Sequence, residues 1–260
     1  MIHGLRIHLV AIKLALATRM AHRADFMMSA SMMVAVELIV PLITFLIYRS
    51  GAGYPGWSLY QAMLIQGLFL LAKGIAFPLY FGMVRNTLNL VREGSFDLLL
   101  LKPNSPLFMV IITAFDPEEL GKLFGGLVLV SVALRHVPNP SLSQWLLFCL
   151  LMVLSQMMIF SWAMIMSAAV FKWVGNSRVF EIFDAVTDFG NYPLSIFSKG
   201  AQTVLSIAMP VAMIAFFPAS VLLGQSQPLL VPCMVMTLVF LCVGSLYWRW
   251  MLARYTSAGG

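Results

Sequence analysis

Charged residues and cysteines are scarce in this 260-residue chain, and both shortages narrow the classes of protein that it can be. Asp, Glu, Lys and Arg make up 10% of the residues, against about 25% in a soluble globular domain, while hydrophobic residues make up 61%. A mean hydropathy of +0.92 places the chain in a lipid bilayer. Cys149, Cys233 and Cys242 all lie in apolar runs without a CxxC pair, so we interpret them as small hydrophobic residues within membrane spans.

Motifs of the common catalytic and ligand-binding sites are missing as well. The sequence contains no GxxxxGK[ST] phosphate-binding loop, no HExxH metal motif and no GxSxG nucleophile motif. Its four histidines do not cluster with cysteines or acids, and its basic residues follow membrane topology instead of forming a patch with interleaved aromatics. We therefore expect no catalytic residue, metal site or cofactor on this chain, and no nucleic-acid partner.

Apolar runs predict an all-α membrane protein, with six transmembrane helices in a single domain over residues 1–260. A helix needs about 20 residues to cross the apolar core of a bilayer. Five runs approach or exceed this length: residues 26–48, 57–83, 120–137, 145–171 and 229–251. A sixth span is required if both termini face the cytoplasm, because only an even number of spans returns the chain to its starting side.

Residues 179–224 admit two arrangements. In the first, residues 179–191 begin the fifth span, and residues 192–224 dip into the outer leaflet as broken, re-entrant helices, because two prolines interrupt their apolar run. In the second, residues 201–223 span the membrane, and residues 179–197 lie in the interface. The acidic residues of this stretch argue against both parts spanning fully, and either arrangement keeps six spans.

Basic residues indicate which side of the membrane each connection occupies. They gather in residues 6–23, 85–122, 172–178 and 249–254, and placing these groups inside puts twelve of the sixteen bases in the cytoplasm. Residues 1–24 alternate apolar residues with bases, which predicts an amphipathic helix lying against anionic lipid headgroups, the alternative being a polar tail with chance periodicity. The same bases interrupt any long apolar core, so we do not interpret this segment as a signal peptide.

Residues 85–119 form a polar segment between the second and third apolar runs. Its centre, residues 91–103, reads Val-Arg-Glu-Gly-Ser-Phe-Asp-Leu-Leu-Leu-Leu-Lys-Pro. Helical spacing of the apolar residues predicts a helix that Pro103 and Pro106 end. Gly94 would weaken a helix interior by about 1 kcal/mol relative to alanine, or would permit close approach of another backbone. The segment is either a docking element for a cytosolic partner or an interfacial helix without one.

This run resembles the Arg-x-Gly-x-x-Asp-x-x-Leu-x-(Arg/Lys)-Pro segment of ABC-2 type transporter permeases, and more narrowly that of their short six-span bacterial subgroup. Residues 191–197 with 207–220, and the C-terminal residues 254–259, resemble further segments of the same family. These resemblances recur in order over nearly the whole chain.

The resemblance implies a permease subunit of an ATP-driven exporter in the bacterial inner membrane, working as a dimer with an identical or related second permease. Two separate cytosolic ATPase subunits would bind ATP and magnesium. It also implies that the polar segment is a cytoplasmic coupling helix that sits in a cleft of the ATPase, and that residues 192–224 are the re-entrant helices. The residues at the matching coupling positions are Arg92, Glu93, Gly94, Asp97, Lys102 and Pro103.

Charges inside the apolar runs form a second group of candidate site residues. Glu37 and Lys73 lie mid-span, where they are expected to pair with each other, to reach the interface or to contact substrate. Asp184 and Asp188, with Glu181, share one helical face that either lines a translocation path or meets nearby bases. With Tyr192, these residues are our candidates for the path: Glu37, Lys73, Asp184, Asp188 and Tyr192.

Two other classes of protein remain open at this point. An ion-coupled secondary transporter would use the intramembrane charges as a relay, although no internal repeat of the kind common in such carriers is visible. A membrane scaffold subunit would carry no substrate and would not need an ATPase.

Overall fold

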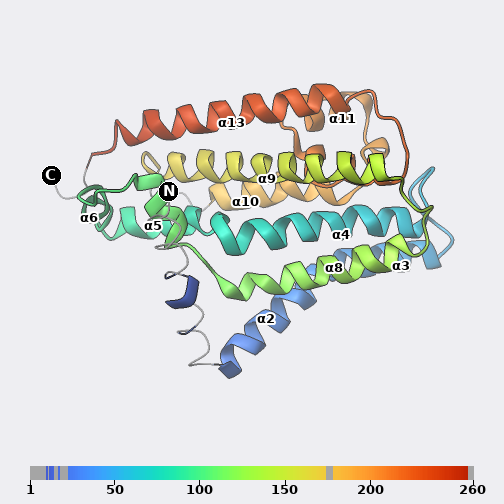
Figure 1. The fold of residues 1–260 in the computed structure, drawn as a ribbon, viewed down its shortest axis with the longest axis horizontal. Helices are drawn as coiled ribbons and strands as arrows, with labels where there is room; N and C mark the ends of the chain where they lie inside the picture. Colours follow the sequence, from blue (N-terminus) through green and yellow to red (C-terminus); the bar gives the residue numbers. More distant parts are fainter. Residues whose placement is uncertain (1–9, 11, 15–16, 18–22, 174–177, 257–260) are drawn as a thin grey trace.

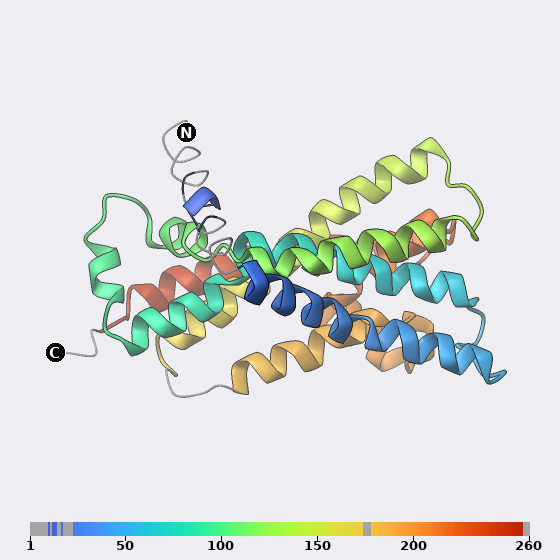
Figure 2. The same ribbon diagram turned by 90° about the horizontal axis from the view of Figure 1, so that it is seen from below.

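Long helices laid side by side account for most of the described chain (Figures 1 and 2). The computed structural model describes residues 10, 12–14, 17, 23–173 and 178–256, so the interfacial helix expected over residues 1–24 falls largely outside the described residues. Every secondary-structure element of the described part is helical, as expected from the sequence. The longer elements are α2 (Arg23–Glu37), α3 (Ile39–Arg49), α4 (Leu59–Ala76), α5 (Met83–Arg92), α8 (Leu120–Leu134), α9 (Leu142–Val170), α10 (Arg178–Thr187) and α13 (Leu230–Leu252).

Four helical stretches of the described chain are long and apolar enough to cross a membrane. They are Arg23–Arg49, Leu59–Arg92, Leu142–Val170 and Leu230–Leu252, and they confirm four of the expected spans. The third and fifth expected spans correspond to α8 and α10, which have 15 and 10 residues and are too short to meet the same criterion. The architecture is therefore that of a helical membrane protein, and the number of six spans stays a prediction.

Helices α4 and α8 pack with their backbones almost in contact (Figure 2). A Cβ added at Gly67 or Gly74 of α4, or at Gly126 of α8, would lie closer than 3.0 Å to a backbone nitrogen of the facing helix. Lipid chains are as apolar as leucine, so helices in a bilayer associate through close van der Waals packing, which small residues permit. The glycines therefore set the distance between these two helices.

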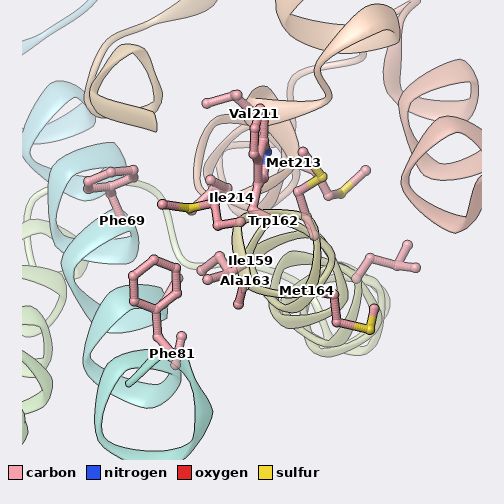
Figure 3. Close-up of a cluster of buried hydrophobic side chains, with 14 of the residues drawn as sticks. Phe69, Phe81, Ile159, Trp162, Ala163, Met164, Val211, Met213 and Ile214 are labelled. Atoms are coloured by element: carbon pink, nitrogen blue, oxygen red, sulfur yellow. The ribbon is translucent and has the colours of Figure 1, made fainter. Parts of the chain in front are cut away.

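The core of the bundle lies between α4, α9 and the segment before α12 (Phe216–Leu222) (Figure 3). Phe69 from α4, Ile159 and Trp162 from α9, and Met213 and Ile214 are all buried there. The hydroxyl of Ser155 on α9 also donates a 2.8 Å hydrogen bond to the carbonyl oxygen of Ile214. This contact fixes the 192–224 segment on α9 by its backbone as well as its side chains.

Residues 192–224 are divided into short helices. Pro210 separates two short helical pieces and lacks the N–H that a continuous helix would need, and which part of residues 179–224 crosses the membrane stays a prediction. The expected broken helices are present; that they dip into the outer leaflet stays a prediction. The elements are η4 (Leu194–Ile196), α11 (Lys199–Thr203), η5 (Val204–Ala208), η6 (Val211–Met213) and α12.

Candidate functional site

The polar segment is carried on the end of a long continuous helical rod. Helix α4 passes through a π-helical turn, η1 (Phe77–Phe81), directly into α5, so that Leu59–Arg92 is helical over 34 residues. At about 1.5 Å per residue the rod is roughly 50 Å long, whereas the apolar core of a bilayer is about 30 Å thick. Pro78 has no N–H for the regular ladder, which explains the wide turn. The rod is therefore longer than a helix that crosses the bilayer upright needs to be.

Gly94 ends the rod, and the expectation that it lies inside a helix or against another backbone of this chain is wrong, while its coupling role stays a prediction. Its φ of +67° is left-handed, and its N–H bonds to the carbonyl oxygen of Val91 (3.2 Å), as at a typical glycine that terminates a helix. A Cβ at this position would meet no atom within 4 Å. Gly94 is thus neither inside a helix nor in close contact with another backbone; it turns the chain from α5 into α6.

Helix α6 (Phe96–Leu100) is short, and the prolines after it do not act together as a stop. The helix ends at Leu100, before Pro103. Pro106 instead begins α7 (Pro106–Ile112), with Ser105 accepting a 3.3 Å hydrogen bond from the N–H of Phe108. Proline is favoured at the first position of a helix because an N–H at that position has no partner within the helix, so a residue without an N–H loses no hydrogen bond there. The expectation that Pro106 terminates the element is therefore wrong.

One side of this turn is left uncovered by the rest of the described chain. Arg92, Glu93, Lys102 and Pro103 are all exposed, as expected of docking residues. Leu98 and Leu101 lie among them with 65% and 83% of their surface accessible, and Leu100 is 42% exposed. We refer to these seven residues as the tip. An apolar patch rimmed by both signs of charge is typical of a surface that another protein covers.

The other side of α6 is buried against the far ends of α9 and α13. Phe96 is fully buried, and its ring centroid lies 4.9 Å from that of Phe171 and 5.1 Å from that of Tyr255, both edge-to-face. Phe171 also contacts Tyr255 (5.4 Å) and Trp248 (5.3 Å). Residues from three separate parts of the chain thus meet at the end of the bundle where Figure 1 places α5, α6 and the last turns of α13. Sequence reasoning missed this aromatic cluster.

Asp97 is half-buried and lies beside the hydroxyl of Tyr255. Burial of that hydroxyl, and then the neighbouring Asp97 carboxylate, raise the pKa of Tyr255 above its usual value of about 10. The phenol therefore stays protonated at neutral pH, with its hydrogen available to the carboxylate. Asp97 is one of the six residues expected to dock a partner, and its side chain lies against its own chain.

Glu37 and Lys73 do pair, as the sequence predicted, and they belong to a larger group. The Lys73 ammonium lies 3.7 Å from a Glu37 carboxylate oxygen, and that of Lys122 lies 3.3 Å from the same oxygen. Lys122 is also 2.7 Å from Glu119, in η2 (Pro117–Glu119). Both ammonium groups lie over the ring of Phe77, at 5.4 Å and 4.2 Å from its centroid. We call the two lysines and two glutamates the charge cluster.

The charge cluster joins the polar segment to the middle of the bundle. Glu37 ends α2, and Pro41, four residues on, has no N–H to bond to its carbonyl oxygen, which accounts for the break between α2 and α3. Glu119 lies at the end of the polar segment, one turn before Lys122 on α8. A backbone hydrogen bond of 3.2 Å from Asp116 to Pro78 adds a second link between the polar segment and the rod. Sequence reasoning missed Glu119 and Lys122, because Glu119 was placed in the polar segment and Lys122 at the cytoplasmic start of the third apolar run.

The remaining candidates for the path lie elsewhere. Tyr192 packs edge-to-face against Tyr54, in the connection between α3 and α4, with ring centroids 6.1 Å apart. Asp188 is exposed at the start of η3 (Asp188–Asn191), and Asp184 lies on α10, its side chain outside the described residues. The candidates therefore divide into Glu37 and Lys73 of the charge cluster and a second group formed by α10, η3 and Tyr192. Across the described residues, no group of three or more His, Cys, Asp or Glu could hold a metal ion.

Comparison with known proteins places this geometry in a family. Residues 32–259 match the family described as ABC-2 family transporter protein. No curated protein and no solved structure matches the chain. The match covers most of the chain, including the rod, the tip, the charge cluster and the broken helices. The chain belongs to the ABC-2 transporter family, and it is a multi-pass membrane permease of an ABC transporter.

Proposed function

We propose that this chain is the permease subunit of an ATP-driven exporter of the bacterial inner membrane, and that a separate cytosolic ATPase binds its tip. Membership of the ABC-2 family supports the permease role. The main support for the docking site is the exposed tip at the end of the rod. The sequence has no phosphate-binding loop of its own, so the ATP and magnesium belong on the partner.

The tip has the composition that a protein-binding surface requires. Leu98 and Leu101 supply apolar area, and the charges of Arg92, Glu93 and Lys102 surround them. Apolar contacts at the centre of an interface supply most of the affinity, whereas charges at its rim mainly select the partner and orient it. A cleft on the ATPase with an apolar floor and charges of both signs would fit this surface.

The rod gives the bound ATPase a mechanical connection to the membrane. Because α5, η1 and α4 are one helical element, a displacement of the tip on ATP binding would move α4 as a body. Helix α8 would follow, since its backbone is in close contact with α4. The ATPase shifts the permease between inward-facing and outward-facing states only to the extent that it binds one state better than the other.

Some helix faces are not covered by the rest of this chain, and we propose that they contact lipid and a second permease, which is either identical or related. The Arg23–Arg49 and Leu230–Leu252 stretches have only 11% and 17% of their most apolar windows buried inside the chain. Along the path between the two permeases, we propose that Glu37, Lys73, Asp184, Asp188 and Tyr192 face the substrate at some stage of transport. Their charge and position support this role.

The docking proposal is tested by purifying the chain in mild detergent from its native membrane and identifying the bound proteins. We expect an ATPase in stoichiometric amount. The Leu101→Glu variant should recover at least tenfold less of it, because a charge would be placed at the apolar centre of the tip. Leu142→Glu is the matched control: Leu142 is 77% exposed at the opposite end of the bundle, and it begins a helix, where an acidic residue is favourable.

Equal recovery from Leu101→Glu and Leu142→Glu would remove the tip from the docking role. Absence of any ATPase from well-folded wild-type preparations would favour an ion-coupled carrier or a scaffold subunit instead.

The proposed orientation predicts a second, independent result. Single cysteines placed at Asn104, next to the tip, and at Asn139, between α8 and α9, should react with an impermeant maleimide from opposite sides of the membrane. Asn104 should be labelled from the cytoplasm, and Asn139 from outside. The exposed native Cys149 and Cys242 are replaced by serine beforehand. Labelling of both positions from one side would contradict the proposed topology.

A further inference from the structure

The C-terminal end of the chain and the polar segment, far apart in the sequence, are brought together at the aromatic cluster. Residues 91–103 and residues 254–256, which belong to two of the runs that resemble the family, lie in these two places. We propose that Tyr255 is a positioning residue that holds α6, and with it the tip, in a fixed orientation at the end of the bundle. The proposal rests on the docking function proposed for the tip, which it extends to a residue outside the polar segment.

The packing supports this role because α6 is too short to hold its own position. It has five residues, and an isolated helix of that length is unstable in water. Leu98, Leu100 and Leu101 are exposed, so the burial that fixes α6 comes from Phe96 and Leu99. Phe96 is enclosed by Phe171 and Tyr255. Aromatic pairs in this geometry contribute about 0.5–1.5 kcal/mol each beyond the burial of area.

The hydroxyl of Tyr255 adds orientation to this packing. It lies beside the carboxylate of Asp97, the residue that follows Phe96, so that one side chain of the C-terminal segment contacts two successive residues of α6. A ring contact alone would permit α6 to rotate about its axis, whereas a polar contact to the next residue selects one rotation. The rotation matters because it decides whether Leu98 and Leu101 face outward.

The C-terminal segment is itself anchored. Backbone N–H groups of Arg254 and Tyr255 bond to the carbonyl oxygens of Met251 and Leu252 (3.1 Å and 3.2 Å), which continues the end of α13 in a turn. The Arg254 guanidinium lies 4.1 Å from the centre of the Trp250 ring. Trp248, also on α13, is buried and contacts Phe171. Movement of α13 relative to α9 would therefore reach α6 directly, without passing through the rod.

Hydrogen–deuterium exchange on the purified permease without ATPase tests this role. Tyr255→Phe keeps the ring and removes the hydroxyl. We expect backbone exchange of residues 96–101 to become several-fold faster, because the contact between the hydroxyl and the Asp97 carboxylate is lost, while exchange in α4 and α9 stays unchanged. Asp97→Asn should give a similar increase, and the double variant should exchange no faster than either single variant, because both remove one contact.

Tyr247→Phe is the matched control, since Tyr247 lies on α13 shortly before the C-terminal segment and stacks on Trp250. Unchanged exchange in Tyr255→Phe, or an equal change in Tyr247→Phe, would overturn the positioning role, whatever the ATPase does. If exchange becomes faster in Tyr255→Phe but the permease binds no ATPase, the positioning role of Tyr255 is supported and the proposed docking function of the tip is contradicted. Faster exchange together with reduced ATPase recovery would support both.

Discussion

Replacing Lys122 by methionine should lower the free energy of unfolding by about 3–5 kcal/mol, the cost of breaking a buried ion pair by removing one partner. Lys122 is 6% exposed and is the one residue that contacts both glutamates of the charge cluster. Its loss leaves Glu119 without this cation and Glu37 with the more distant Lys73 alone. Methionine fills a similar volume, so the expected loss comes from charge and not from a cavity.

Thermal or denaturant unfolding in detergent measures this loss, and two further variants make the result specific. Lys172→Met removes an exposed lysine and should change stability by no more than about 0.5 kcal/mol. The double variant Lys122→Met with Glu119→Gln removes a charge of each sign and should recover much of the loss. If Lys122→Met and Lys172→Met were equally stable, the charge cluster would have no structural role.

Substituting alanine for Gly74 should lower stability by about 3 kcal/mol, at the upper end of the usual cost of overpacking. The added Cβ would lie closer than 3.0 Å to the backbone of Lys122 and Leu123. A helix backbone cannot move aside as a side chain can, so α4 and α8 would have to separate. That separation would also move Lys73 away from Lys122, because Lys73 precedes Gly74 on α4 and Lys122 precedes Leu123 on α8. The charge cluster therefore depends on the absence of a side chain at position 74.

The matched substitution is Gly200→Ala. A Cβ at Gly200 meets no atom within 4 Å, and the residue lies in helix α11. Alanine is a better helix former than glycine, so this variant should be unchanged or more stable by about 0.5–1 kcal/mol. The two variants make the same chemical change and differ only in what surrounds it. A loss of stability in both would show that the membrane protein is sensitive to alanine in general, which would remove the close helix contact as the cause.

Some expectations from the sequence were met because the relevant interaction is local or is imposed by the bilayer. The four long spans follow from length and hydropathy alone. The pairing of Glu37 with Lys73 follows from the high cost of an unpaired charge within a membrane. The break between η5 and η6 follows from Pro210.

Other expectations failed where the outcome depends on the backbone conformation of a single residue. Glycine is compatible with a helix interior, a close contact or a left-handed turn, and the sequence around Gly94 did not distinguish these uses. Pro106 is compatible with the end of one helix or the start of the next, and Ser105 before it was the signal for a start. The sequence predicted the Glu37 and Lys73 part of the charge cluster. It did not predict Glu119 and Lys122, because they join the cluster only through the close packing of α8 on α4.

The sequence by itself determined that this protein is a helical membrane permease, since hydropathy fixes the environment and the ordered family segments fix the class. It also determined which segment is polar and exposed. Only the tertiary structure decided which residues meet: Phe96 with Tyr255, Asp97 with the same tyrosine, and Lys122 with Glu37. These partners are separated by up to about 160 residues, and helix periodicity specifies the face on which a residue lies but not the helix that covers it.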